Sequence, residues 1–156
     1  MVGLRALVEV FPDRTIKTYK DPALAAVEAE WYARLPWACP RLLDLDGGTL
    51  TIETCEPGPD LLDWRPADRL RELLGAVHAE GVHHRDLHLR NVVRGRAGEP
   101  LLIDWETAIE YPAEFSYDLH GPAASGVPIP EIHTRLIPAW WGSREKMSIK
   151  NQWGIE

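Results

Sequence analysis

The stretch "HAEGVHHRDLHLRNVV", residues 78–93, gathers histidines, arginines, one aspartate and one asparagine among regularly spaced apolar residues. Polar groups held among buried apolar neighbours are costly unless they are paired or carry a function. A turn-rich segment, "GRAGEP", follows at residues 95–100, and then a short apolar strand that ends at Asp104. A hairpin therefore separates Asp86 from Asp104, and the two carboxylates can converge at one end of it.

These side chains match the chemistry of phosphoryl transfer. Asp86 can accept a proton or orient a hydroxyl group. The carbonyl oxygen of Asn91 and the carboxylate of Asp104 offer the oxygen ligands that a hard cation such as Mg²⁺ prefers. A base, a metal clamp and charge compensation are the parts that this reaction requires. The alternative, in which the three residues are ordinary loop caps, does not account for their joint spacing.

The segments "HHRDLHLRN" (83–91) and "LLIDWE" (101–106) together resemble the catalytic loop and the metal-binding strand end of the protein-kinase-like superfamily. The form is closest to its aminoglycoside and choline phosphotransferase branch. The resemblance implies that Asp86 is the catalytic base and that Asn91 and Asp104 bind the metal, with Asn91 also serving the nucleotide site. It further implies that His88 and Arg85 are catalytic groups that steady charge in the transition state.

Two upstream segments extend the resemblance to the phosphate-binding lysine and its partner. "RTIKTYKDP" (14–22) resembles the strand that carries this lysine, which implies Lys17. "VEAEWYARL" (27–35) resembles the helix whose glutamate pairs with it, which implies Glu28. Lys20 and Glu30 are the fallback pair. The alternatives are a plain surface lysine and a glutamate on a solvated helix face.

Two other segments add a base-binding connector and a brace. "LTIETCEPG" (50–58) resembles the adenine-binding hinge, with the backbone from Glu53 to Cys55 facing the base. "FSYDLHG" (115–121) resembles the segment in which an aspartate, here Asp118, braces the catalytic loop; a helix cap is the alternative.

The histidines of the loop call for different interpretations. We expect His84 to pack inward and hold backbone carbonyls, and His83 to be exposed. A zinc site built from His83, His84 and His88 is the alternative, but it would need a further ligand nearby.

The hydrophobic pattern predicts an α+β fold. Two strands at 4–11 and 14–19 are joined by a turn at Pro12-Asp13, and a helix over 21–35 has Asp21 as its N-cap. A second hairpin at 41–54, a connector at 56–66, a helix over 66–81 that stops at Gly81 and a strand at 100–105 follow. With the resemblance, we expect one two-lobed kinase-like domain over 1–156. It has a truncated strand-rich N-lobe (about 1–56) and a reduced helical C-lobe (about 60–156).

Composition excludes several other classes of protein. The chain has 156 residues and a net charge of −7, which disfavours nucleic acid and anionic membranes as partners. Cys39 and Cys55 are too few for a disulfide framework, so we expect reduced thiols and a cytoplasmic location. No apolar run approaches the roughly 20 residues of a membrane span. The sequence does not indicate an oligomeric state.

Departures from the family pattern leave two functions open. The sequence has no glycine-rich phosphate loop, and the segment between Asp104 and Asp118 is too short for a long activation loop. The main prediction is an enzyme that uses ATP and Mg²⁺ to phosphorylate a hydroxyl of a small-molecule or protein acceptor. "HGPAASGVPIPEIH" (120–133) occupies the place of acceptor-binding elements. The alternative is a pseudokinase that binds nucleotide or a partner protein without catalysis.

Overall fold

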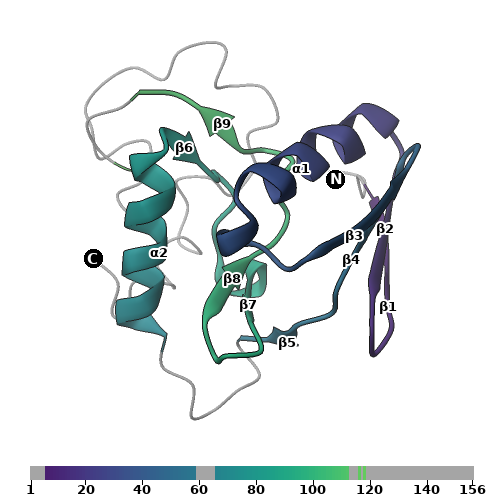
Figure 1. Cartoon of the computed structure of the whole chain (residues 1–156). Helices are drawn as coiled ribbons and strands as arrows, with labels where there is room; N and C mark the ends of the chain where they lie inside the picture. The colour runs from purple at the N-terminus through teal and green to yellow at the C-terminus, as the bar shows by residue number, and fades with distance from the viewer. Residues whose placement is uncertain (1–5, 59–65, 113–115, 117, 119–156) are drawn as a thin grey trace.

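A computed structural model describes residues 6–58, 66–112, 116 and 118 of the chain (Figure 1). These residues form an α+β fold of two α-helices and three small antiparallel sheets. The α+β prediction is confirmed. The segment 120–133 and the outer limits of the two predicted lobes lie outside this part of the chain.

The N-terminal part is a four-stranded antiparallel sheet in the order β1-β2-β4-β3. Its strands are β1 (Ala6–Val10), β2 (Thr15–Tyr19), β3 (Leu42–Asp46) and β4 (Thr49–Ile52). Both predicted hairpins are present, and Gly47, with φ +56°, makes the second turn. Lys17 on β2 pairs with Val8 on one side and with Leu50 on the other, so these three side chains share one face of the sheet.

Helix α1 (Pro22–Arg34) lies across the sheet and was predicted nearly to the residue. The Asp21 side chain accepts a hydrogen bond from the Ala23 amide, and Pro22 occupies the first turn. The helix buries the face that carries Glu28 and Tyr32. A short 3₁₀ turn, η1 (Pro36–Ala38), follows it.

The second part of the chain is built around helix α2 (Ala67–Ala79) and a hairpin. The hairpin pairs β7 (Val92–Arg94) with β8 (Pro100–Leu102), and β5 (Glu56–Pro57) adds a third strand inside the predicted connector. β6 (Val82–His83) pairs with β9 (Ile109–Glu110), and η2 (Leu89–Asn91) leads into β7. Gly81, with φ +73°, follows the end of α2 as predicted. The strand predicted at 100–105 ends early, because Asp104 has φ +63° and leaves the extended conformation.

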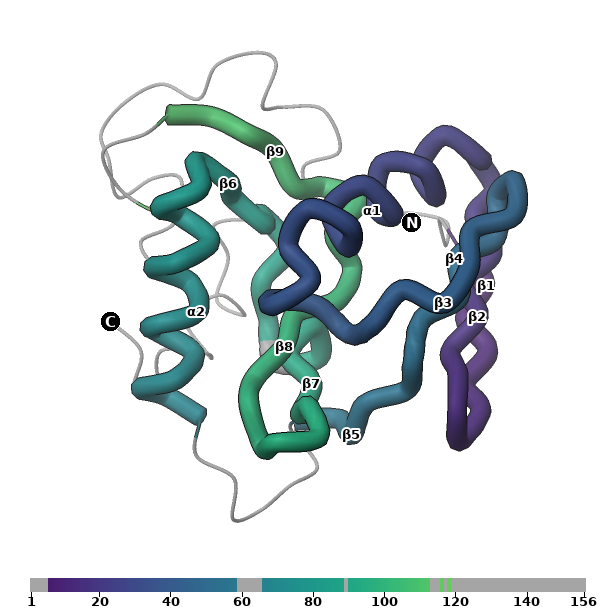
Figure 2. Tube along the Cα trace, in the orientation of Figure 1, coloured from purple at the N-terminus to yellow at the C-terminus, as the bar shows by residue number. Residues whose placement is uncertain are grey.

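Buried apolar residues from both parts form one hydrophobic cluster, which includes Tyr32, Leu50, Leu74, Leu102 and Trp105. Figure 2 shows α2 and the four-stranded sheet on opposite sides, with α1 and the β7–β8 hairpin between them. Cys39 and Cys55 are free thiols, as expected. Neither of the described helices is long and apolar enough to cross a bilayer.

Candidate active site

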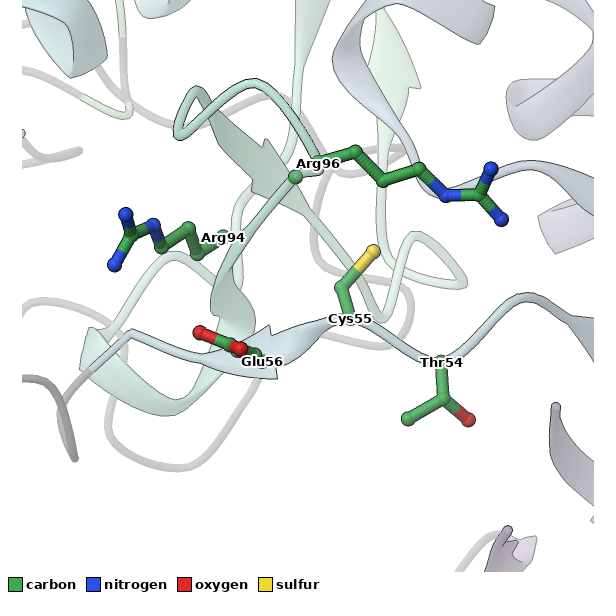
Figure 3. A pocket seen from close by; sticks show the side chains of 6 residues that line it. Thr54, Cys55, Glu56, Arg94 and Arg96 are labelled. Carbon is green, nitrogen blue, oxygen red and sulfur yellow. The ribbon is translucent and has the colours of Figure 1, made fainter. Parts of the chain in front are cut away.

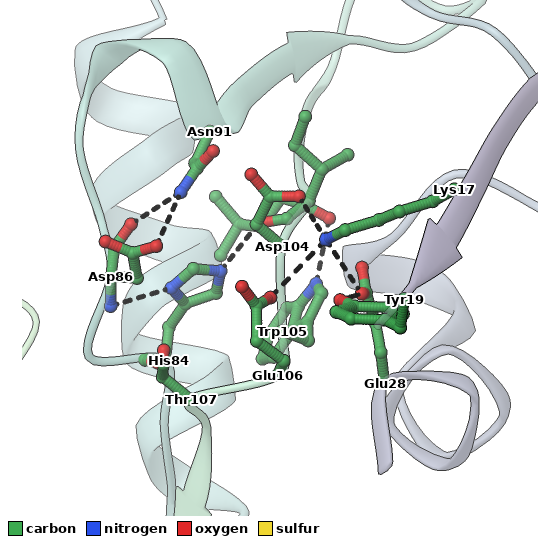
Figure 4. A network of polar contacts seen from close by, with 12 residues as sticks. Lys17, Tyr19, Glu28, His84, Asp86, Asn91, Asp104, Trp105, Glu106 and Thr107 are labelled. Atoms are coloured by element: carbon green, nitrogen blue, oxygen red, sulfur yellow. Dashed lines mark hydrogen bonds and ion pairs between the residues drawn. The ribbon is translucent and has the colours of Figure 1, made fainter. Parts of the chain in front are cut away.

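Lys17 is the centre of a buried polar cluster assembled from three segments of the chain (Figure 4). Its Nζ atom lies 2.9 Å from Glu28 Oε2 on α1, 2.7 Å from Asp104 Oδ1 after β8 and 3.5 Å from Glu106 Oε2. The structure thus brings Lys17 and Glu28 into the contact that the resemblance implied. The fallback residues Lys20 and Glu30 are exposed instead.

One lysine faces three carboxylates in this cluster, so its electrostatics are dominated by negative charge. Burial lowers the pKa of Lys17, but Asp104, Glu28 and Glu106 outweigh it and raise the pKa above the ordinary value of lysine. Burial raises the pKa of Glu28, although Lys17 opposes that shift. One ligand oxygen from each of the three carboxylates lies within 4.8 Å of the others, which is close enough for a shared cation.

Two members of the cluster were not identified from the sequence. The Tyr19 hydroxyl donates a hydrogen bond to Glu28 Oε2, and the Tyr19 ring centroid lies 4.7 Å from Lys17 Nζ. Glu106 approaches the same ammonium from beyond Asp104. Spacing could have indicated them, because Tyr19 stands two residues after Lys17 and Glu106 stands two residues after Asp104.

Asp86 and Asn91 form a second polar group beside the cluster. Asn91 Nδ2 donates to the Asp86 backbone oxygen at 2.8 Å and to Asp86 Oδ2 at 3.4 Å. His88 Nε2 lies 3.9 Å from Asp86 Oδ1, while His88 Nδ1 accepts from the Arg90 amide. Figure 4 shows Asp104 between this group and Lys17. Four predicted site residues (Asp86, Asn91, Asp104 and Lys17) therefore face one region.

Asp118 holds the backbone at the start of the loop. Its carboxylate accepts the His84 amide at 2.7 Å and the Arg85 amide at 2.9 Å. Arg85 has φ +71°, a left-handed conformation that a non-glycine residue adopts only when its surroundings stabilise it. The predicted contact between Asp118 and the loop is therefore present.

His84 fixes the loop from the inside. Its Nδ1 accepts the Asp86 amide at 3.1 Å, and its Nε2 lies 2.8 Å from the Ile103 carbonyl, which can only accept. These two contacts place a ring proton on Nε2. With both ring nitrogens bonded to backbone, His84 cannot serve as the zinc ligand that the alternative required, whereas its predicted inward packing is confirmed by full burial.

Two side chains lie deeper than the sequence indicated. Arg85 is 2% exposed, and its Nε donates to the Thr107 carbonyl at 2.6 Å. Burial lowers the pKa of Arg85 to about 10, which still leaves it charged at neutral pH. His83 was predicted to be exposed, and that prediction is wrong. It is fully buried because β6 pairs with β9, and its Nε2 bonds the Tyr111 carbonyl.

A row of rings connects α1 to the loop that carries His84 and Asp86. The Trp31 and Trp105 ring centroids are 6.5 Å apart, and the Trp105 and His84 centroids are 4.7 Å apart. Trp105 is fully buried, and its Nε1 donates to the Leu102 carbonyl. Trp31 follows Glu28 by about one helical turn, so these rings pack the helix that carries Glu28 against the loop.

The connector between the two parts borders a pocket of about 350 Å³ (Figure 3). Thr54, Cys55 and Glu56 line one side, and Arg94 at the end of β7 and Arg96 in the following turn line the other.

Glu53, at the start of this connector, contacts Arg41 and the pocket residue Arg96, whose Nη2 lies 3.5 Å from Glu53 Oε2. Its amide donates to the Arg41 carbonyl, so a backbone hydrogen bond from Glu53 to a base would have to use its carbonyl oxygen. Glu53 also accepts the Arg41 amide through its side chain. Burial raises the pKa of the Cys55 thiol to about 11.

Comparison with known proteins supports the fold. No protein-family model and no curated protein sequence matches the chain. The fold is similar to that of WbdD. A crystal structure of monomeric WbdD is 17% identical, covers 69% of this chain and 33% of the WbdD chain, and has a TM-score of 0.55.

Two further structures agree with that result. One, described as the bifunctional kinase-methyltransferase WbdD, is 16% identical over 69% of this chain and 31% of that one, with a TM-score of 0.53. The other, WbdD with a kinase inhibitor, is 16% identical over 70% and 32%, with a TM-score of 0.54. The chain thus spans about a third of the length of WbdD and is similar in fold to that bifunctional kinase-methyltransferase.

Proposed function

We propose that the protein is an ATP- and Mg²⁺-dependent phosphotransferase that moves the γ-phosphate of ATP to a hydroxyl group of a small-molecule or protein acceptor. One observation carries the proposal. Lys17, Glu28 and Asp104 come from three separate segments and meet beside Asp86 and Asn91. Loop caps or surface charges would have no reason to converge in this way.

Lys17 is the residue that neutralises phosphate charge in this proposal, and Glu28 orients it. The Lys17 side chain is buried, so its charge acts in a medium that screens it less than water does. Val8 and Val10 lie on the same face of the sheet as Lys17 and are 50% and 68% exposed. They offer an apolar surface to the base of a nucleotide.

Asn91 and Asp104 are suited to hold Mg²⁺. Because the Asn91 amide nitrogen bonds Asp86, its carbonyl oxygen is left for a cation, and the Asp104 side chain is 35% exposed. Both donors are oxygens, which fits a hard cation. When bound, the ion would neutralise phosphate charge and help to orient the phosphates.

Asp86 is the proposed base. It orients the acceptor hydroxyl and takes up its proton as the new oxygen–phosphorus bond forms and the bond to the β-phosphate oxygen breaks. His88, 3.9 Å from Asp86, is the proposed group that steadies charge there. For the buried Arg85 we propose a positioning role, since its guanidinium bonds a backbone carbonyl.

A pseudokinase is the second candidate. The ion pair between Lys17 and Asp104 favours it, because this contact engages an oxygen that the metal would otherwise bind. The test measures the melting temperature with and without MgATP, and then ADP release over time. A thermal shift together with ADP release above background supports the enzyme. A shift without release supports a nucleotide-binding pseudokinase. No shift at millimolar MgATP contradicts both the enzyme and the nucleotide-binding pseudokinase, and leaves a pseudokinase that binds only a partner protein.

A further inference from the structure

The hydrogen bonds of Lys17 leave it no spare donor. An ammonium group has three N–H groups, and Lys17 Nζ lies within 3.5 Å of three carboxylates. To bind a phosphate it must release one of them. Asp104 is the partner most open to exchange, because its side chain is 35% exposed, against 1% for Glu28 and 10% for Glu106. Once Asp104 is released, Glu28 has to keep its place for Lys17 to stay oriented.

Tyr19 is placed to hold Glu28 during that exchange. It stands two residues after Lys17 on β2, so the two side chains share a face of the sheet. Its hydroxyl donates to Glu28 Oε2, the oxygen that also accepts Lys17 Nζ. Both residues are buried, at 4% and 1% exposure, so water cannot replace the phenol as a donor.

We propose that Tyr19 is a positioning residue of the nucleotide site, which fixes Glu28 through its hydroxyl while Lys17 exchanges Asp104 for a phosphate. This inference rests on the proposed function. It assigns the phenol a part in nucleotide affinity and none in the proton transfer at Asp86.

The chain offers a matched control in Tyr32. This phenol is also buried, at 2% exposure, and stands on α1 one turn after Glu28. Its hydroxyl has no hydrogen-bond partner among the residues that the structure describes. Tyr32→Phe therefore removes an equally buried hydroxyl from the same region without touching Glu28.

The experiment measures the dissociation constant of a non-hydrolysable ATP analogue with Mg²⁺ for wild type, Tyr19→Phe and Tyr32→Phe. We expect Tyr19→Phe to raise it by roughly 5- to 10-fold, because a hydrogen bond to a charged group is lost. Tyr32→Phe should change it by less than about 2-fold. In assays of ATP turnover, Tyr19→Phe should raise KM for ATP, while kcat stays within about 3-fold of the wild-type value.

A double-mutant cycle separates positioning from general loosening of the fold. In a Lys17→Met background, adding Tyr19→Phe should raise the dissociation constant by less than about 2-fold, because the Lys17–Glu28 ion pair that Tyr19 holds in place is already gone. An equal loss in both backgrounds, or unchanged binding by Tyr19→Phe alone, overturns the inference. If wild type itself does not bind the analogue, the proposed function fails first.

The melting temperature of each variant shows that it is folded. Should Tyr19→Phe not fold, Tyr19→His takes its place, because a ring N–H can still donate to Glu28. Nucleotide binding by Tyr19→His within about 3-fold of wild type then supports the inference. A loss as large as that of Lys17→Met contradicts it.

Discussion

Lys17 Nζ and Asp104 Oδ1 lie 2.7 Å apart, although 87 residues separate them along the chain. The lysine proposed to bind phosphate thus holds an oxygen of the carboxylate proposed to bind metal. The Lys17 ammonium and the metal ion would compete for the Asp104 carboxylate, and an incoming phosphate would draw Lys17 away from it. Metal and nucleotide should therefore strengthen each other's binding. A metal bound to Asp104 frees Lys17 for the phosphate, and a phosphate bound to Lys17 frees Asp104 for the metal.

Replacing the lysine tests this competition directly. Lys17→Met should lower the free energy of unfolding by about 3 kcal/mol, because it leaves the buried Glu28 carboxylate without its ammonium partner. It should also let Mn²⁺ alone, without nucleotide, raise the melting temperature more than it does in wild type. Lys20→Met, at an exposed lysine on the same segment, is the control. Equal Mn²⁺ shifts in Lys17→Met and wild type would contradict the competition.

Asp104→Asn should weaken nucleotide binding mainly when Mg²⁺ is present. The change removes a full negative charge from the proposed metal site but keeps the shape of the side chain. The measurement is the dissociation constant of ATP with Mg²⁺ and with EDTA. We expect a loss of roughly 10-fold or more with Mg²⁺, and little loss or a slight gain without it. Equal losses under both conditions would show that Asp104 does not bind the metal.

Much of the site could be predicted because its signals are local. Asp86 and Asn91 stand five residues apart on one loop, and α1 begins with an N-cap and a proline that are visible in the sequence. Tyr19 and Glu106 were missed because their contacts depend on how α1 and the segment after β8 pack against β2. Spacing alone does not fix that packing.

His83 shows the opposite error, since this titratable side chain was expected to be exposed, and no pattern in the sequence indicated the burial of Arg85. Their burial comes from tertiary contacts. β6 and β9 are two residues each, too short to show a strand pattern, and Arg85 adopts a left-handed conformation braced by Asp118.

Asp118→Asn should destabilise the loop. The two oxygens of Asp118 accept two backbone amides, whereas asparagine has one acceptor oxygen, so one buried amide would lose its partner. We expect a loss of roughly 1–3 kcal/mol in urea unfolding and slower ATP turnover. Asp44→Asn, at an exposed position on β3, should change neither. Unchanged stability of Asp118→Asn would remove its role as a brace.

His83 should make stability depend on pH. Burial lowers its pKa in the folded protein below the ordinary 6.5. As the pH falls through 6.5, the unfolded chain takes up a proton that the folded protein resists, so stability is lost toward acid, by at most about 1.4 kcal/mol per pH unit. His83→Gln should lose less stability than wild type between pH 7.5 and 5.5 in urea unfolding. The same pH dependence in both proteins would show that His83 is not the source of the loss of stability toward acid.

Asp86→Asn separates the enzyme from the pseudokinase. The side chain keeps its shape, and the contacts proposed for the phosphates lie at Lys17, Asn91 and Asp104. The variant should therefore melt within a few degrees of wild type and bind the ATP analogue with similar affinity. ADP release should fall by at least about 10²-fold, since a positioned base is lost. Asp68→Asn, whose carboxylate is 92% exposed on α2, is the control and should keep wild-type turnover. If wild type and Asp86→Asn release ADP at the same rate while both bind nucleotide, Asp86 is not the base and the pseudokinase is the better account of the site.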